Sequence, residues 1–229
     1  MTNEADSLRE HTHFSPAERL LEAPDPVGGG LKRALDIAIA LAAIVFFLPL
    51  LLLLALVVWA QGDGPIIFSH TRVGFGGNDF RCHKFRSMVP DAQQRLAKLL
   101  QEDPEALAEW NATHKLKNDP RITPLGQFLR KSSLDELPQL FNVLKGEMSL
   151  IGPRPITRSE VPQYEGSFAD YARTRPGLTG LWQVSGRSDV SYRERVRMDV
   201  SYVTNWSFVG DLMILVRTVP AILVRRGSY

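Results

Sequence analysis

The pattern of hydrophobic and polar positions divides the chain into three parts. Residues 1–30 are rich in proline, glycine and acidic side chains, and we expect them to form a flexible N-terminal tail. Residues 37–60, IAIALAAIVFFLPLLLLLALVVWA, contain no charge and are long enough to enter a bilayer. From residue 62 onward the composition is that of a soluble domain. We therefore predict a tail (1–30), a membrane segment (31–61) and a globular domain (62–229).

Two membrane topologies fit the apolar segment. As one straight helix, residues 37–60 would measure about 36 Å and could cross a core of about 30 Å, so length favours a span. Pro49 lies near the middle, removes a hydrogen bond and disfavours helical geometry at Leu48. Each arm beside the proline reaches only about half the core, but kinks also occur in spanning helices. Lys32 and Arg33 place the front of the segment at the cytoplasmic face.

The remaining pattern predicts an α+β fold that is mostly helical. We expect a β-hairpin over 65–88, surface helices over 91–101 and 104–117, and a short helix over 123–133. A further helix should start near Asp135, with Pro138 in its first turn, and stop at Gly146. We interpret 148–155 as a stiff turn and 175–187 as a glycine-rich loop. Residues 206–229 are apolar but interrupted by Asp211, Arg217 and Pro220, which is typical of an interfacial amphipathic helix.

Charge narrows the choice of partner. The net charge is only +2, but residues 115–158 hold eight bases against four acids, which suggests an anionic substrate or an acidic membrane surface. The single cysteine, Cys82, excludes an internal disulfide, and its polar sequence neighbours include no partner set for a metal. No nucleotide-binding glycine fingerprint or Walker-type loop is complete, and we expect no nucleic-acid partner.

The stretch SSLDELPQL, residues 132–140, places two carboxylates side by side in this basic region. One interpretation is structural: Ser133 or Asp135 caps a helix start, and acidic residues suit the positive end of the helix dipole. The other is chemical, because a carboxylate among phosphates can hold Mg²⁺ or attack phosphorus. The residues alone leave both interpretations open for Asp135 and Glu136.

Arginines beside prolines and glycines favour the chemical interpretation. Guanidinium groups match phosphate oxygens, and rigid turns hold them in place. Any one of them could be an ordinary surface residue, but together they indicate phosphate binding. The candidates are Arg130, Arg154 and Arg175, to which we add Lys84 and Arg86 of the HKFRSM stretch.

The blocks KFRSM, DPRIT, LRKSSLDELPQLFNVLKGEMSLIGPRP and RPGLTGLWQVSGR resemble the signature blocks of the bacterial sugar transferases, the monotopic phosphoglycosyl transferases. The match extends from Leu31 to Tyr229. The spacing and the RGSY end are similar to the small exopolysaccharide enzymes that move galactose-1-phosphate onto undecaprenyl phosphate. The resemblance implies a membrane segment that re-enters at a break at Pro49, so that both of its ends lie on the cytoplasmic face of the inner membrane.

The resemblance also implies a reaction. Asp135 would attack the β-phosphorus of a UDP-hexose, release UMP and form a phosphosugar–aspartate, which undecaprenyl phosphate then resolves. Glu136 would complete the catalytic dyad, and the two carboxylates are the expected Mg²⁺ ligands. Arg130 and Arg154 match the family's phosphate-binding arginines. The loop residues Gly177, Thr179, Gly180 and Trp182 match the part that meets the nucleotide, although an ordinary surface turn is the alternative for that loop.

Two other functions remain open from the sequence. The chain could be a catalytically silent membrane scaffold for polysaccharide assembly, or a module that binds lipid head groups. The first would tolerate loss of the dyad, and the second would need the basic patch but not the adjacent acids. The sequence leaves open the sugar, with galactose expected before glucose, and the oligomeric state, for which a homodimer is one option.

Overall fold

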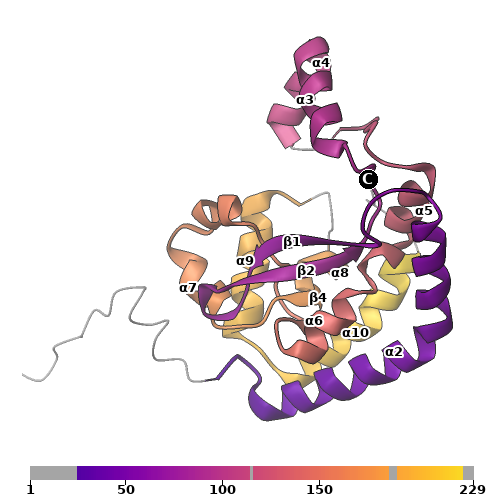
Figure 1. Ribbon diagram of the computed structural model, residues 1–229. Helices are drawn as coiled ribbons and strands as arrows, with labels where there is room; N and C mark the ends of the chain where they lie inside the picture. The colour runs from indigo at the N-terminus through magenta and orange to yellow at the C-terminus, as the bar shows by residue number, and fades with distance from the viewer. Residues whose placement is uncertain (1–24, 114–115, 186–189, 224–229) are drawn as a thin grey trace, which may run out of the picture.

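The computed structural model describes residues 25–113, 116–185 and 190–223. Almost all of the predicted tail lies outside these residues. The fold is mostly helical, with two small sheets, and a long apolar helix lies along its lower and right-hand edges (Figure 1). The α+β class predicted from the pattern is confirmed.

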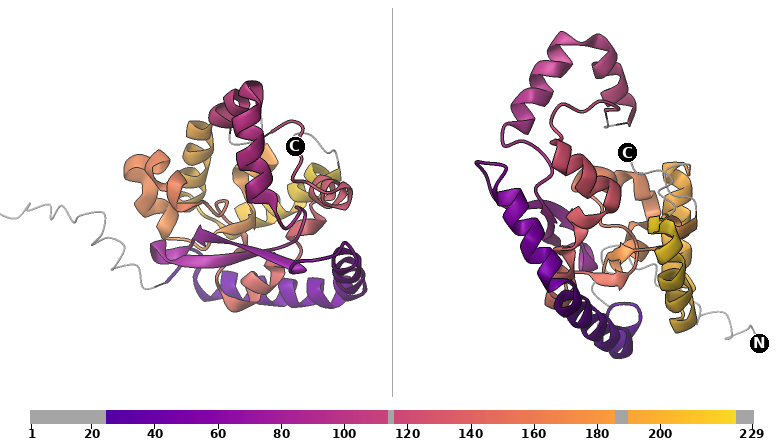
Figure 2. Two further views of the ribbon diagram at one scale, coloured as in Figure 1. Left: turned by 45° about the horizontal axis from the view of Figure 1, so that its top comes forward. Right: turned by 90° about the vertical axis from the view of Figure 1, so that its right-hand side faces the viewer.

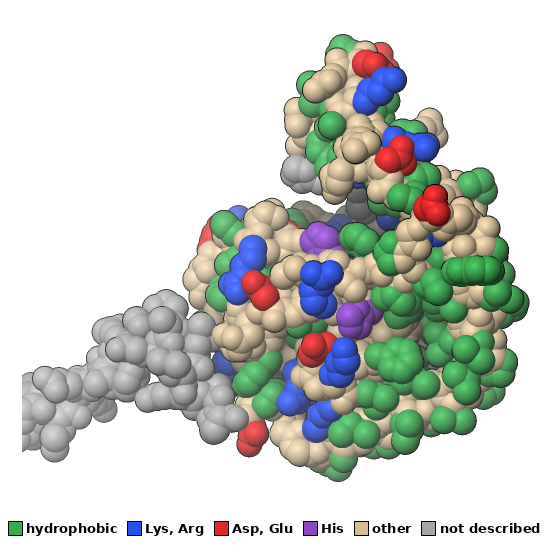
Figure 3. Space-filling model, in the orientation of Figure 1, with side chains coloured by type: hydrophobic (Ala, Val, Ile, Leu, Met, Phe, Trp, Pro, Cys, Tyr) green, Lys and Arg blue, Asp and Glu red, His purple; other side chains and the backbone are tan. Residues whose placement is uncertain are grey.

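The apolar segment forms helix α2, Gly29–Trp59, which begins two residues before the predicted membrane segment. Pro49 lies inside it, and the ribbon is bent into two arms rather than broken (Figure 1). This helix is long and apolar enough to cross a membrane by length and composition. Hydrophobic side chains cover the flank where α2 runs (Figure 3), because only a narrow stripe, which includes Ala40, Leu54 and Val58, faces the domain.

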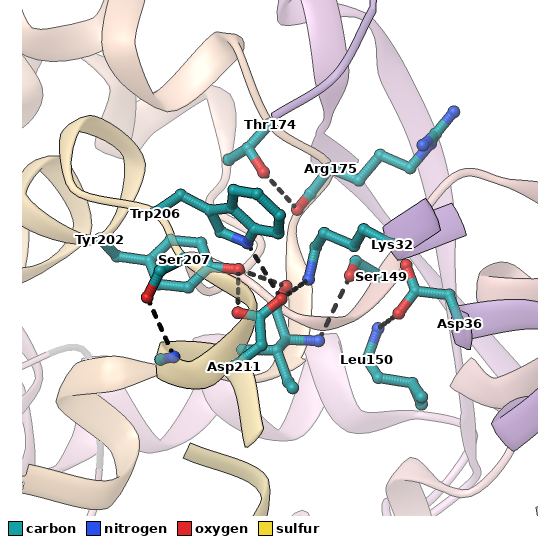
Figure 4. Close-up of polar contacts among 12 residues, drawn as sticks. Lys32, Asp36, Ser149, Leu150, Thr174, Arg175, Tyr202, Trp206, Ser207 and Asp211 are labelled. Carbon is teal, nitrogen blue, oxygen red and sulfur yellow. Dashed lines mark hydrogen bonds and ion pairs between the residues drawn. The ribbon is translucent and has the colours of Figure 1, made fainter. Parts of the chain in front are cut away.

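Polar contacts fasten the first turns of α2 to the domain. Lys32 forms a buried ion pair with Asp211 of α10, with Nζ 2.5 Å from Oδ2 (Figure 4). The Asp36 carboxylate accepts a hydrogen bond from the Leu150 amide at 3.0 Å. The Arg33 guanidinium donates to the carbonyls of residues 143 and 144, at the end of α6. The polar start of α2 is therefore part of the folded domain.

The predicted β-hairpin is confirmed. Strands β1 (Ile67–Val73) and β2 (Asp79–Phe85) pair antiparallel, with Ile67 opposite Phe85. The turn between them contains the 3₁₀ segment η1, Phe75–Gly77, and Gly76 and Gly77 adopt positive φ there. Cys82 of β2 is buried in the core rather than set among polar neighbours, and burial raises the pKa of its thiol to about 11.

A second sheet was not predicted. Strand β3 (Ser149–Ile151) lies in the expected stiff turn and β4 (Gly177–Thr179) in the expected glycine-rich loop, and the two pair in parallel. The backbones come so close that a Cβ added at Gly177 would lie 2.1 Å from the Gly152 nitrogen. Three-residue strands carry too little alternation to be recognised, and their partners are remote in sequence.

The remaining helices surround these sheets. Helices α3 (Ala92–Glu102) and α4 (Pro104–Thr113) project from the body (Figures 1 and 2). The central part contains α5 (Pro124–Ser132), η2 (Leu134–Glu136) and α6 (Gln139–Lys145). The last part contains η3 (Arg158–Ser167), α7 (Phe168–Ala172), α8 (Leu181–Ser185), α9 (Tyr192–Thr204) and α10 (Phe208–Leu223). Helix α9 was not predicted.

Helix α10 has the exposed apolar face expected of the C-terminal segment. Phe208, Val209, Leu212 and Val216 are exposed on it, whereas Ile214 packs into the core. Asp211 does not interrupt the helix at the surface, as its sequence position had suggested. Its side chain is buried and forms an ion pair with Lys32 of α2.

Candidate active site

The two adjacent carboxylates lie on a tight turn rather than at the start of an α-helix. Helix α5 ends at Ser132 and is followed by Ser133, whose φ of 58° is left-handed, and the chain continues into the 3₁₀ segment η2 that carries Asp135 and Glu136. Pro138 then precedes α6, which begins only at Gln139. Neither η2 nor α6 begins with a side-chain cap, so the predicted helix start capped by Ser133 or Asp135 is wrong. Leu137 and Pro138 both have helical backbone angles, but Pro138 has no N–H to donate to the Leu134 carbonyl, which instead accepts a 3₁₀-type bond from the Leu137 amide.

Lys84 of β2 bridges the two carboxylates. Its Nζ lies 2.6 Å from Glu136 Oε1 and 3.7 Å from Asp135 Oδ2. Burial alone would lower the pKa of Lys84, but the charges of Glu136 and Asp135 outweigh it, and the net effect raises this pKa. The lysine therefore stays charged between the acids and is not merely a solvated strand residue.

Asp135 is the buried member of the pair, with 5% of its surface exposed. Burial raises its pKa, and Lys84 and Arg130 oppose that rise. Arg130 is itself largely buried, which lowers its pKa, and its Nε donates to Ser87 Oγ at 2.9 Å. The cations therefore help to keep a desolvated carboxylate ionised, which is the form that can attack an electrophile.

A pocket opens beside this turn. Its polar lining comes from β1, β2, η2, α6, the 152–155 turn and α8: Arg72, Lys84, Glu136, Gln139, Arg154 and Gln183. Gly177 and Leu178 of β4 form part of its wall. The pocket thus brings together the predicted residues Lys84, Glu136, Arg154 and Gly177, with Asp135 directly behind Lys84.

Sequence reasoning missed Arg72, Gln139 and Gln183. A signal for Arg72 was present in the hairpin, because Arg72 pairs with Phe80 and residues directly opposite share one face of a sheet. Side chains alternate along a strand, so Phe80, Cys82 and Lys84 lie on that same face. The strand alternation therefore places Arg72 on the same side as Lys84. We find no comparable signal for the two glutamines.

Two of the predicted phosphate-binding arginines lie elsewhere. The Arg86 guanidinium donates to the carbonyls of Val58, Gly62 and Asp63, at the end of α2. Arg175 donates from Nε to the Gly146 carbonyl, and in Figure 4 its side chain extends away from the Lys32–Asp211 ion pair. Both arginines therefore satisfy helix-end carbonyls, and neither lines the pocket.

The predicted nucleotide-binding residues have different surroundings. Thr179 Oγ1 hydrogen-bonds to Thr218 Oγ1 of α10 at 2.9 Å, so this hydroxyl already has a protein partner. Trp182 is buried beneath the Arg195 guanidinium, which lies 4.8 Å from the ring centroid. Gly180 is needed for packing, because an added Cβ would lie 2.2 Å from the Gly152 oxygen. This segment is a packed structural layer rather than an ordinary surface turn.

The donor set is suited to Mg²⁺ only in part. Within the described ranges no group of three or more His, Cys, Asp or Glu side chains could hold a metal. However, Mg²⁺ in phosphate-transfer sites is usually held by one or two carboxylates together with substrate phosphates and water. Asp135 and Glu136 supply such a pair, and the ammonium of Lys84 already lies between them as a cation. The residues present therefore fit a Mg²⁺ ion that completes its coordination with a phosphorylated ligand.

Comparison with known proteins identifies the family. A model of the family described as "Bacterial sugar transferase" matches residues 28–225. The exopolysaccharide production protein ExoY of Rhizobium meliloti (strain 1021) is 49% identical over 204 residues, which cover 89% of this chain and 90% of that protein. The undecaprenyl-phosphate galactose phosphotransferase of Salmonella typhimurium is 52% identical over 199 residues, 87% of this chain and 42% of that protein. The UDP-glucose:undecaprenyl-phosphate glucose-1-phosphate transferase of Caulobacter vibrioides is 39% identical over 206 residues, 86% of this chain and 72% of that protein. The chain therefore belongs to the bacterial sugar transferase family and is a transferase.

Proposed function

We propose that this protein transfers a hexose-1-phosphate from a UDP-hexose to undecaprenyl phosphate and releases UMP, as the first step of exopolysaccharide assembly. The observation that carries the proposal is the buried Asp135 carboxylate behind Lys84, at the edge of a pocket that Arg154 also lines. A silent scaffold would not need a buried, cation-stabilised carboxylate. A head-group binding module would need the cations but not the acids.

The reaction would proceed by two displacements at one phosphorus atom. First, an Asp135 carboxylate oxygen attacks the β-phosphorus, the bond to the α-phosphate oxygen breaks, and UMP leaves with that oxygen. Second, a phosphate oxygen of the lipid attacks the same phosphorus, and the bond to Asp135 breaks. One phosphoanhydride replaces another, so no external energy source is needed.

The residues around Asp135 would each contribute to these two displacement steps. Lys84 can transfer its ammonium hydrogen bond from Glu136 to the incoming phosphate, which would bring the phosphate next to Asp135. Arg130 would keep Asp135 ionised, and Arg154 would bind phosphate oxygens across the pocket. Asp135 and Glu136 would hold Mg²⁺, whose charge offsets repulsion between the two anionic reactants.

The proposal includes a location for the protein. Helix α2 would enter the inner membrane from the cytoplasmic face, bend at Pro49 and return, with α10 lying in the interface. The bend and the lipid-compatible outer surface of α2 support this topology (Figures 1 and 3). So do the polar ties at both ends of α2, because Lys32 and the carbonyl of Val58 each bind the same domain.

For the sugar we propose galactose, with glucose as the second candidate. Relatives named for each sugar match the chain, and the galactose enzyme of Salmonella typhimurium has the higher identity of the two, 52% against 39%. Assays across UDP-galactose, UDP-glucose and UDP-N-acetylglucosamine decide the question. A strong preference for the N-acetylated donor would reject an unacetylated hexose.

The catalytic proposal is tested with detergent-purified protein, UDP-[³²P-β]galactose and undecaprenyl phosphate. Wild type should release UMP and, without lipid acceptor, should retain label on the protein. Asp135→Asn should stay folded but lose both signals, and Lys131→Gln, at an exposed position in α5, serves as the control. Turnover by Asp135→Asn within tenfold of wild type would exclude covalent catalysis at this residue. EDTA should stop UMP release and Mg²⁺ should restore it; full activity in chelator would exclude the metal.

The topology is tested with single cysteines at the exposed positions Asp25 and Gln101, one on each side of α2. The native Cys82 is buried and should not react with an impermeant thiol reagent. In intact cells a re-entrant helix protects both new cysteines until the membrane is opened. Labelling of position 25 alone from outside would establish a spanning helix.

A further inference from the structure

Arg72 has no assigned role, yet its side chain lines the pocket beside the two carboxylates. The neighbouring Val73 is firmly held: its amide donates to the Ile156 carbonyl at 2.8 Å, and its carbonyl accepts from Tyr171 Oη at 2.7 Å. These bonds join β1 to the segment that follows Arg154. The backbone of Arg72 is therefore fixed beside the 152–155 turn.

The Arg72 guanidinium itself is only loosely bound. Its Nη1 lies 3.3 Å from the Pro155 carbonyl and 3.4 Å from Glu160 Oε2, both longer than an ordinary N–H···O bond. Glu160 Oε2 also accepts shorter bonds from the Thr157 amide (2.7 Å) and hydroxyl (2.8 Å), so Arg72 is its weakest partner. Within the described ranges, Nε and Nη2 of Arg72 form no hydrogen bond. Most of its donors are therefore available to a ligand.

Arg72 also faces a second cation. Burial lowers the pKa of Arg72, and the charge of Arg154 lowers it further, so the two guanidinium groups are close enough to repel each other. Arg154 is exposed and forms no hydrogen bond or ion pair with the part of the chain that the structure describes. The Glu160 carboxylate offsets only part of this repulsion through its long contact with Arg72, so two arginines lining one pocket favour an anionic ligand at this position.

We propose that Arg72 and Arg154 form a two-guanidinium clamp for the diphosphate of the nucleotide donor. Two adjacent phosphates offer each arginine its own pair of oxygens, which matches the fork geometry of both side chains. The lipid acceptor carries a single phosphate, and one guanidinium would suffice for it. This inference rests on the proposed function for the identity of the ligand but not for the presence of a phosphate site.

The decisive comparison is between Arg72→Gln and Glu160→Gln. The first removes the guanidinium. The second removes only its ion pair, because glutamine can replace glutamate in the capping box that Thr157 and Glu160 form. Arg72→Lys keeps the charge without the fork, and it also provides a comparison if the glutamine variant does not fold. Binding of UDP and of UDP-galactose is measured by titration calorimetry on purified protein, together with KM values for donor and lipid acceptor.

We expect Arg72→Gln to weaken UDP and UDP-galactose binding about ten- to a hundredfold, the loss of one or two charge-assisted hydrogen bonds. Arg72→Lys should fall in between, and Glu160→Gln should stay within about twofold of wild type, as expected for a partly exposed ion pair. The KM for the donor should rise while that for undecaprenyl phosphate does not.

Several results would overturn the clamp. Unchanged UDP binding by Arg72→Gln would exclude it. An equal loss in Glu160→Gln would show that Arg72 acts through its ion pair. A rise in the KM of the lipid acceptor alone would assign the guanidinium to the acceptor phosphate. If wild type released no UMP from any donor but bound UDP in an Arg72-dependent manner, the proposed function would fail and the phosphate site would stand.

Discussion

Replacing Lys32 by methionine tests how α2 is fastened to the domain. Lys32 and Asp211 are both nearly buried, with 8% and 9% of their side chains exposed, and their charged atoms are 2.5 Å apart. Tyr202 Oη and Trp206 Nε1 donate to the same carboxylate at 2.8 Å and 3.0 Å (Figure 4). Methionine preserves most of the lysine stem, so the substitution removes the charge and little packing.

The expected loss can be worked from this geometry. At 2.5 Å and an effective dielectric constant of about 20, the two charges attract by roughly 6–7 kcal/mol. Desolvation of the two ions offsets most of this attraction, so the intact pair contributes little net stability. Removal of one partner is different, because the buried Asp211 charge then keeps its desolvation cost and loses its counter-ion. We therefore expect Lys32→Met to lower the free energy of unfolding by about 3–5 kcal/mol.

The assay is thermal unfolding of the detergent-purified protein, followed by circular dichroism. For a chain of 229 residues a loss of this size lowers Tm by about 6–20 °C. Lys98→Met is the matched control, because Lys98 is exposed and lies 3.8 Å from Glu102; its Tm should change by no more than about 2 °C. Asp211→Asn, added to Lys32→Met, should restore part of the loss because it removes the unpaired charge. If Lys32→Met behaved like the control, or if the double variant were no better than the single one, the reasoning would be refuted.

Three further predictions concern the site and its support. Lys84→Gln removes a charge that opposes the burial-driven rise in the pKa of Asp135, so the acid limb of the pH–rate profile for UMP release should move to higher pH; an unchanged limb would contradict this. Burial raises the pKa of Asp199 to about 7. The stability that the protonated Asp199 contributes is therefore complete below about pH 4 and is lost as the pH rises to 7. The Tm of Asp199→Asn should rise relative to that of wild type between pH 4 and pH 8, and a constant difference in Tm would contradict the raised pKa. Gly177→Ala should lower the free energy of unfolding, measured by denaturant titration, by about 1–3 kcal/mol or more, because the added Cβ would lie 2.1 Å from backbone. Gly166→Ala, where the added Cβ meets open space, should be nearly neutral.

The elements that the sequence predicted well are those with long or repeated signals. The run from Ile37 to Ala60 has no charge to interrupt it, and the hairpin joins two seven-residue strands through glycines at positive φ. Strands β3 and β4 were missed because each has three residues and pairs with a segment far away in the chain. The start of α6 was placed too early for a related reason. A proline permits a helix start but does not determine whether the preceding residues form an α-helix or a tighter turn.

The candidate site divides in the same way. Asp135 and Glu136 are neighbours in the chain, so the sequence alone was enough to suggest a site with two carboxylates. The arginines depend on tertiary structure. Arg154 lines the pocket, whereas Arg86 and Arg175 bind carbonyls at helix ends. The sequence does not distinguish an arginine that binds phosphate from one that binds a helix-end carbonyl, because both oxygens accept hydrogen bonds from the same guanidinium donors.

The contacts of Arg86 also explain how the apolar helix and the two adjacent carboxylates are held in fixed positions relative to each other. Lys84 and Arg86 lie two residues apart on one stretch of chain, the first on the carboxylates and the second on the carbonyl of Val58, where α2 ends. At the other end of α2, Arg33 binds the last carbonyls of α6, the helix that follows the turn with Asp135 and Glu136. The turn with Asp135 is thus connected to both ends of α2 through short, rigid segments. With α2 in the bilayer as proposed, these two connections would hold the carboxylate at a constant depth relative to the head groups. A lipid-linked phosphate cannot leave that depth without exposing its chain to water, so a nucleophile held there would meet it without any large movement of the domain.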